Sequence, residues 1–219
     1  MKINRSSNHA VTKSINMASL KDKAVFLDRD GTINELVYFP EFGLIDSPLN
    51  PDQFKLIPGV AEAIKLFNKM GLKVIIVSNQ PAIAKGKTTM KLFEEIRAKM
   101  KNLLEEAGAH IDGEYYCFHH PEAKLPEFRV DCECRKPKPG LLLKAARDFN
   151  LNLKECFMVG DGITDMMAGQ AVGCKTILIG RLKCELCKVM DDLGVKPSYI
   201  VQNLNQAAEI IKKEVLHND

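Results

Sequence analysis

The sequence has no long hydrophobic run. No apolar segment of the 219-residue chain approaches the roughly 18 residues that a membrane-spanning helix requires. Residues 1–20 are polar and lack the apolar stretch of a secretory signal peptide, so we expect a disordered leader, with Met17 as an alternative start. These absences predict a cytoplasmic protein that does not span a membrane.

The sequence also carries little net charge. Its 31 Lys and Arg residues and 28 Asp and Glu residues give a formal charge of +3. The basic residues are scattered and often interleaved with glutamates, as between residues 91 and 106, which is typical of a solvated helix face. We therefore expect no nucleic-acid partner. The expected partner is a small molecule, and the protein is expected to be a monomer.

The number of cysteines also argues against a disulfide framework. Seven cysteines, an odd number, fit metal binding and buried thiols better than disulfides. Cys156 and Cys174 lie beside predicted strands, where small buried thiols are common, and are assigned to the core. Cys184 and Cys187 form a C-x-x-C pair for which a second zinc site or a redox role stays open, because no other ligand pair lies nearby.

Predicted strands and helices alternate along residues 21–219, which we interpret as one domain. Expected strands lie at 24–28, 72–78, 114–119, 156–160, 175–179 and 199–201, and expected helices at 58–70, 88–107, 141–149, 165–172 and 204–216. This alternation predicts an α/β fold with a Rossmann-like parallel sheet and helices on both faces. The proline-rich segment 35–56 breaks the rhythm and predicts a loop or hairpin that could form a flap over the site.

Two aspartates stand at the end of the first predicted strand. Asp28 and Asp30 are two residues apart, and Gly31 allows the chain to turn away behind them. With a divalent cation, one carboxylate could attack phosphorus while the other transfers protons to the leaving alcohol and from water. The alternative is a strand end with two solvated aspartates and a turn glycine.

Three later segments place polar residues near other predicted strand ends. The amide and hydroxyl residues Ser78, Asn79 and Gln80 could hold phosphate oxygens, and Arg135 and Lys136 supply positive charge. Two further carboxylates, Asp161 and Asp165, could complete the shell of a magnesium ion. Each segment alone has another interpretation, such as a helix cap, a surface charge or a turn.

These four segments, in this order, resemble the motifs of the haloacid dehalogenase superfamily of phosphatases. The resemblance implies that Asp28 is the nucleophile and Asp30 the general acid/base. It implies that Ser78 and Lys136 bind the transferring phosphoryl group. It also implies that Asp161 binds Mg²⁺ together with Asp28 and the backbone carbonyl of Asp30, with Asp165 in support.

Four soft ligands form a second constellation. Cys117 and His119 are followed, after twelve residues, by Cys132 and Cys134. Three thiolates and one imidazole complete a tetrahedral Zn²⁺ shell and leave no position for water, which predicts a structural site that folds a polar, proline-rich loop. His120 is an alternative ligand, and a redox-active thiol pair with buried cysteines is the alternative site.

A zinc loop directly before the lysine motif resembles one subgroup of the superfamily. That subgroup contains D-glycero-D-manno-heptose-1,7-bisphosphate 7-phosphatase and the phosphatase domain of histidinol-phosphate phosphatase. The resemblance implies that Arg135, Ser78, Asn79 and Gln80 contact substrate. The chain departs from the heptose enzymes at Gly162, where they have a lysine, and in the longer segment after the first motif.

The sequence therefore predicts a magnesium-dependent phosphomonoester hydrolase that forms an aspartyl-phosphate. Its expected substrate is a sugar phosphate such as D-glycero-D-manno-heptose 1,7-bisphosphate. Histidinol phosphate or another small metabolite is the first alternative, and a polynucleotide 3'-phosphate is disfavoured by the weak basic charge. A zinc-stabilised binding module is the alternative outside the enzymes.

Overall fold

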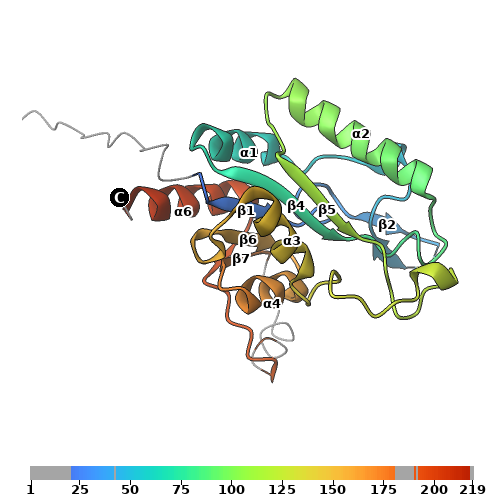
Figure 1. The fold of residues 1–219 in the computed structure, drawn as a ribbon. Coiled ribbons are helices and arrows are strands. Elements are labelled where there is room, and N and C mark those ends of the chain that lie inside the picture. Colours follow the sequence, from blue (N-terminus) through green and yellow to red (C-terminus); the bar gives the residue numbers. More distant parts are fainter. Residues whose placement is uncertain (1–20, 42, 181–189, 191, 218–219) are drawn as a thin grey trace, which may run out of the picture.

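A six-stranded parallel sheet forms the centre of the molecule (Figure 1). The computed structural model describes residues 21–41, 43–180, 190 and 192–217, so Cys184 and Cys187 lie outside the described residues. In spatial order the strands are β5 (Gly113–Cys117), β4 (Lys73–Asn79), β1 (Ala24–Leu27), β6 (Phe157–Gly160), β7 (Lys175–Ile179) and β8 (Tyr199–Val201). The predicted Rossmann-like α/β fold is confirmed.

The order of the strands places β1 at the switch point of the sheet. The chain runs outward from β1 to β4 and β5, then returns to pair β6 with the other side of β1. All four residues of β1 are fully buried, as expected for a parallel strand covered on both faces. Ligands of such sheets bind at the carboxyl ends of the strands near this point, so the segments that follow β1, β4 and β6 are placed to form a site.

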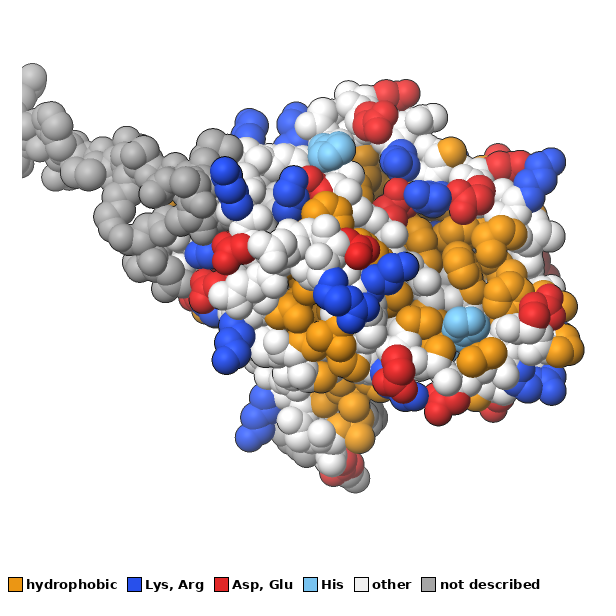
Figure 2. Space-filling view, viewed as in Figure 1, with side chains coloured by type: hydrophobic (Ala, Val, Ile, Leu, Met, Phe, Trp, Pro, Cys, Tyr) orange, Lys and Arg blue, Asp and Glu red, His pale blue; other side chains and the backbone are white. Residues whose placement is uncertain are grey.

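Helices cover both faces of the sheet, as predicted (Figure 1). One face packs against α1 (Val60–Lys69), α2 (Met90–Glu106) and α6 (Leu204–His217). The other face packs against α3 (Gly140–Phe149) and α4 (Ile163–Ala171). On the face drawn in Figure 2, positive and negative side chains are interspersed. No helix in the described part of the chain is both long and apolar enough to cross a membrane.

Element boundaries depart from the predicted ones by one or two residues. β1 ends at Leu27 and β5 at Cys117, so Asp28 and His119 lie in loops beyond the strands. α4 begins at Ile163, which places Asp165 in its first turn. These shifts matter because Asp28, His119 and Asp165 lie outside the strands, so their side chains are directed by turns or by the start of a helix.

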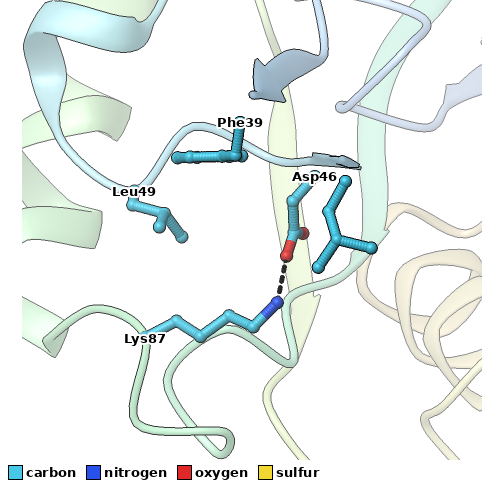
Figure 3. A pocket seen from close by; sticks show the side chains of 5 residues that line it. Phe39, Asp46, Leu49 and Lys87 are labelled. Atoms are coloured by element: carbon cyan, nitrogen blue, oxygen red, sulfur yellow. Dashed lines mark hydrogen bonds and ion pairs between the residues drawn. The ribbon is translucent and has the colours of Figure 1, made fainter. Parts of the chain in front are cut away.

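The segment after β1 contains the predicted hairpin. β2 (Val37–Phe39) and β3 (Leu44–Asp46) pair antiparallel, and the short helix η2 (Pro51–Gln53) follows. Two contacts attach this region to the loop after β4: Lys87 pairs with Asp46 (Figure 3), and the Thr88 hydroxyl donates to the carbonyl of Leu49 at 2.6 Å. The short helices η3 (Pro126–Phe128) and η4 (Leu153–Glu155) lie in other connections.

Candidate active site

Three carboxylates meet at the carboxyl edge of the sheet. Asp28 follows β1, and its backbone N–H donates to the carbonyl of Val159 on β6 at 3.0 Å. Asp161 follows β6, and Asp165 comes from α4. One oxygen from each of the three carboxylates lies within 4.8 Å of the others. The structure therefore brings together side chains that are up to 137 positions apart in the sequence (165 minus 28).

Lys136 is buried beside these carboxylates. Its Nζ lies 2.9 Å from Asp28 Oδ1 and 2.5 Å from Asp165 Oδ1, and it donates to the carbonyl of Val77 at 2.7 Å. Burial alone would lower the pKa of this ammonium, but the two carboxylates raise it well above its usual value. Lys136 is therefore protonated at neutral pH and supplies one fixed positive charge to the site.

The site retains an excess of negative charge. Burial, together with the neighbouring carboxylates of Asp28 and Asp165, raises the pKa of Asp161 to about 7. Burial also raises the pKa of Asp165 despite its contact with Lys136. Closely spaced carboxylate oxygens that are not neutralised by one ammonium fit a hard divalent cation such as Mg²⁺. Asp28 and Asp161 are the residues placed to hold it, with Asp165 beside them.

Two glycines permit the close approach of these carboxylates. Gly31 has a φ of +82°, and a Cβ atom there would lie 2.2 Å from Oδ2 of Asp161. A Cβ atom at Gly160 would lie 2.3 Å from Oδ2 of Asp165. The glycine after the two aspartates of the first motif is thus required both by the turn and by the carboxylate packed against it.

Asp30 is held in a separate network of hydrogen bonds. Its Oδ1 accepts from Nε and Nη2 of Arg29 at 3.2 and 3.0 Å and from Nδ2 of Asn34 at 3.0 Å. Its Oδ2 accepts from Nε2 of Gln80 at 2.6 Å and from Nη2 of Arg29 at 3.1 Å. Both oxygens of this carboxylate are therefore oriented by donors from the loop after β1 and from the end of β4.

The three predicted substrate contacts at the end of β4 hydrogen-bond to other site residues. Asn79 holds the backbone of Lys136: its Nδ2 donates to the Lys136 carbonyl and its Oδ1 accepts from the Lys136 N–H, both at 3.0 Å. Gln80 donates to the hydroxyl of buried Ser78 at 3.1 Å as well as to Asp30. In this arrangement Asn79 and Gln80 position the lysine and Asp30, in addition to any contact that they make with substrate.

Sequence reasoning missed Arg29. Strand alternation would direct it away from Asp28 and Asp30, yet its side chain is buried against Asp30 and its guanidinium carbon lies 5.4 Å from the centre of the Phe93 ring. The reason is the tight turn after β1, in which the N–H groups of Ile33 and Asn34 donate to the Arg29 carbonyl. The position of Arg29 between two aspartates was a signal in the sequence for this contact. The alternation of side chains along a strand does not predict their directions within a turn, so it could not place Arg29 beside Asp30.

The predicted zinc ligands also meet. The Sγ atoms of Cys117, Cys132 and Cys134 lie 3.1 to 3.5 Å apart, and Nδ1 of His119 lies 3.5 Å from Sγ of Cys134. Zn–S bonds of about 2.3 Å imply ligand separations of about 3.8 Å in a tetrahedron, so the sulfurs would move apart by less than about 1 Å to hold Zn²⁺. His120 lies outside it, and its Nδ1 accepts instead from the N–H of Glu122.

The electrostatics of the cluster also fit a cation. Burial and the neighbouring sulfurs raise the pKa of Cys134, and burial raises that of Cys117. Burial opposes ionisation of Cys132 too, but hydrogen bonds from the other two thiols lower its pKa to about 7. Three crowded thiols resist joint ionisation, and Zn²⁺ would offset that repulsion.

The loop that carries Cys132 and Cys134 is joined directly to Lys136. Cys134 precedes Arg135 and Lys136, and Nη1 of Arg135 donates to the carbonyl of His119 at 3.2 Å. The N–H of Gly140, at the start of α3, donates to the carbonyl of Glu133 at 2.9 Å. A Cβ atom at Gly140 would lie 2.3 Å from that carbonyl oxygen. The loop is thus anchored on both sides of Lys136.

Comparisons with known proteins agree with this fold and with the predicted class of enzyme. The profile of the haloacid dehalogenase-like hydrolases matches residues 44–173. The D-glycero-beta-D-manno-heptose-1,7-bisphosphate 7-phosphatase of Pasteurella multocida (strain Pm70) is 37% identical over 87% of this chain and 97% of its own length. The enzyme of the same name from Escherichia coli (strain K12) is 35% identical over 87% of this chain and 94% of its own length.

A solved structure extends the similarity to three dimensions. The D,D-heptose 1,7-bisphosphate phosphatase of B. bronchiseptica, in complex with magnesium and phosphate, superimposes with a TM-score of 0.71 and 28% identity, covering 88% of this chain and 99% of that one. The chain belongs to the haloacid dehalogenase-like hydrolase family. The predicted class, a magnesium-dependent phosphatase, is confirmed, and the cysteine and histidine cluster is consistent with the predicted zinc.

Proposed function

We propose that this phosphatase removes the 7-phosphate of D-glycero-D-manno-heptose 1,7-bisphosphate. The observation that carries the proposal is the cluster of Asp28, Asp161, Asp165 and Lys136 at the sheet edge, in a chain aligned over nearly the full length of relatives that have this name. The zinc cluster directly before Lys136 agrees with the same subgroup.

In the proposed reaction Asp28 is the nucleophile. One oxygen of Asp28 attacks phosphorus and the bond from phosphorus to the sugar oxygen breaks, while Asp30 gives that oxygen its proton. Asp30 then takes a proton from water, whose oxygen attacks phosphorus and breaks the bond to Asp28, which releases phosphate and restores both aspartates. Mg²⁺ supplies charge neutralisation for the phosphoryl oxygens.

The contacts of each residue support its proposed part. Lys136 and the Ser78 hydroxyl lie where they could hold phosphoryl oxygens, and Asn79 clamps the lysine backbone. The donors around Asp30 orient both of its oxygens before substrate arrives. These donors fix the orientation of the ionised carboxylate, which is the form that takes a proton from water in the second step.

The test is phosphate release from heptose 1,7-bisphosphate, compared with histidinol phosphate and a panel of hexose phosphates. We expect the highest kcat/KM for the heptose bisphosphate, with ³¹P NMR showing that the 1-phosphate remains. Asp28→Asn should abolish turnover, because an amide is neither the nucleophile nor an anionic ligand. Higher kcat/KM for histidinol phosphate, or magnesium-dependent activity of the Asp28→Asn enzyme, would contradict the proposal.

The proposal includes the setting in which the enzyme works. We assign residues 21–219 to one catalytic domain that acts as a monomer on a free metabolite in the cytoplasm. Light scattering coupled to gel filtration measures the molecular mass, and a mass near twice 24.5 kDa would contradict the monomer.

A further inference from the structure

Arg29 is a buried cation beside the predicted acid/base. Its side chain is 1% exposed, and its Nη2 lies 3.0 Å from Oδ1 of Asp30. Its Nη1 has no hydrogen-bond partner among the described residues. A buried ion pair rarely adds to stability, and a buried donor without a partner costs free energy. Stability therefore does not explain this arginine, whereas its contacts with Asp30 do.

Most of the hydrogen bonds to the Asp30 carboxylate depend on Arg29. Of the five between described residues, three come from the guanidinium and the others from Asn34 and Gln80. Nη2 of Arg29 also donates to Oε1 of Gln80 at 2.8 Å. This bond turns the amide so that its Nε2, which lies 2.6 Å from Oδ2, donates to Asp30. Arg29 therefore orients Asp30 both directly and through Gln80.

An aromatic cluster holds Arg29 from the other side. The guanidinium carbon lies 5.4 Å from the centre of the Phe93 ring of α2, within the range of a cation–π contact. Phe93 packs edge to face against Tyr116 and Phe118, at centroid distances of 4.9 and 5.0 Å. Phe118 belongs to the segment that holds the predicted zinc ligands. The guanidinium thus lies between a packed aromatic cluster and Asp30, which leaves it little freedom to turn away.

We propose that Arg29 is a positioning residue for the hydrolysis of the aspartyl-phosphate. It keeps the Asp30 carboxylate in one orientation, so that Asp30 takes a proton from water while the water oxygen attacks phosphorus and the bond from phosphorus to Asp28 breaks. Arg29 acts only through Asp30. The inference rests on the proposed reaction but not on the proposed substrate, since every phosphomonoester gives the same aspartyl-phosphate.

An aryl phosphate separates the two steps of the reaction. 4-Nitrophenolate leaves without a general acid, so 4-nitrophenyl phosphate needs the base Asp30 for hydrolysis of the aspartyl-phosphate but hardly for its formation. At saturating substrate, the ratio of phosphorylated to unphosphorylated enzyme equals the rate constant of formation divided by that of hydrolysis. Acid quenching and intact-protein mass spectrometry measure this ratio, and kcat/KM reports formation alone.

Arg29→Met keeps a side chain of similar length and removes the guanidinium. It should raise the ratio of phosphorylated to unphosphorylated enzyme about tenfold or more, the effect of one lost charge-assisted hydrogen bond, with kcat/KM within about twofold of wild type. The matched control is Arg97→Met. This arginine lies one helical turn after Phe93 on α2, is 34% exposed and pairs with glutamates away from Asp30. It should match wild type in both measurements.

A second variant keeps the proposal testable if Arg29→Met does not fold. Phe93→Leu removes the ring beside the guanidinium but keeps an apolar side chain. It should raise the same ratio about threefold, with kcat/KM within about twofold of wild type. A wild-type ratio in the folded variants, or a fall of kcat/KM as large as the fall of kcat, would overturn the proposal, because a merely structural effect impairs formation as well.

Failure of the proposed function is separately visible. A wild-type enzyme that prefers another phosphomonoester overturns the heptose assignment and leaves the test of Arg29 unchanged, because 4-nitrophenyl phosphate gives the same intermediate. If the Asp30→Asn enzyme accumulates no phosphate on Asp28, the proposed reaction is wrong, and so is the proposed role of Arg29.

Discussion

Replacing Lys136 tests how strongly the active-site charges depend on one another. Lys136→Met keeps most of the apolar side chain and removes the ammonium that contacts Asp28, Asp165 and the Val77 carbonyl. Three carboxylate oxygens within 4.8 Å of one another would then lose the ammonium that partly neutralises them. Breaking a buried ion pair by removing one partner costs about 3–5 kcal/mol. We expect the free energy of unfolding to fall by that amount in magnesium-free buffer.

Urea denaturation followed by far-ultraviolet circular dichroism is the suitable assay, because the chain has no tryptophan for fluorescence. Lys138→Met is the matched control: this lysine lies two residues away, and its ion pairs with Asp131 and Glu133 are exposed. We expect little change from it, as is usual for surface pairs. Added Mg²⁺ should restore part of the stability of the Lys136→Met enzyme, because the ion offsets the same carboxylates.

A double variant separates charge from packing. Lys136→Met with Asp165→Asn removes a carboxylate together with the ammonium, so it should be more stable than Lys136→Met alone. The reasoning would be refuted if the free energy of unfolding of Lys136→Met lay within about 1 kcal/mol of the wild-type value. Such a small change is typical of the loss of an exposed ion pair, whereas the loss of a buried one costs more.

The other predictions concern the aspartates, the zinc and the substrate. Asp30→Asn should nearly abolish turnover but trap phosphate on Asp28, visible by intact-protein mass spectrometry, because water then lacks its base; wild-type turnover would exclude this role. Elemental analysis of protein purified without added metal should show about one equivalent of zinc per chain. The Cys132→Ser protein should lose this zinc and have a lower Tm and a lower activity. A zinc-free preparation with full activity and wild-type Tm would exclude a structural zinc. Because Lys87 is paired with Asp46, we expect weak preference for bisphosphates over monophosphates. Gly162→Lys should increase that preference. The φ of −102° suits a side chain, and its Cβ atom would lie 3.1 Å from Oδ2 of Asp165, so that carboxylate must shift by a few tenths of an ångström. A strong native preference that this substitution leaves unchanged would contradict the argument.

The sequence by itself determined the elements of the fold and many of the residues that the structure brings together at the sheet edge, although it missed Arg29. Continuous apolar runs identified buried parallel strands, and polar residues at strand ends identified Asp28, Ser78 and Asp161. The spacing of four soft ligands identified the cluster that contains Cys117 and His119. These signals are local, because strand ends and ligand pairs can be read within a few residues of one another.

Only the tertiary structure decided how those residues meet. The strand order, set by the packing of crossover helices on the sheet, brings Lys136 to Asp28, and the turn after β1 reverses Arg29 onto Asp30. The pairing of Asp46 with Lys87 depends in the same way on a hairpin and a loop that are 41 positions apart. Such contacts connect segments distant in sequence, and neither hydrophobic periodicity nor residue spacing carries information about which of them meet.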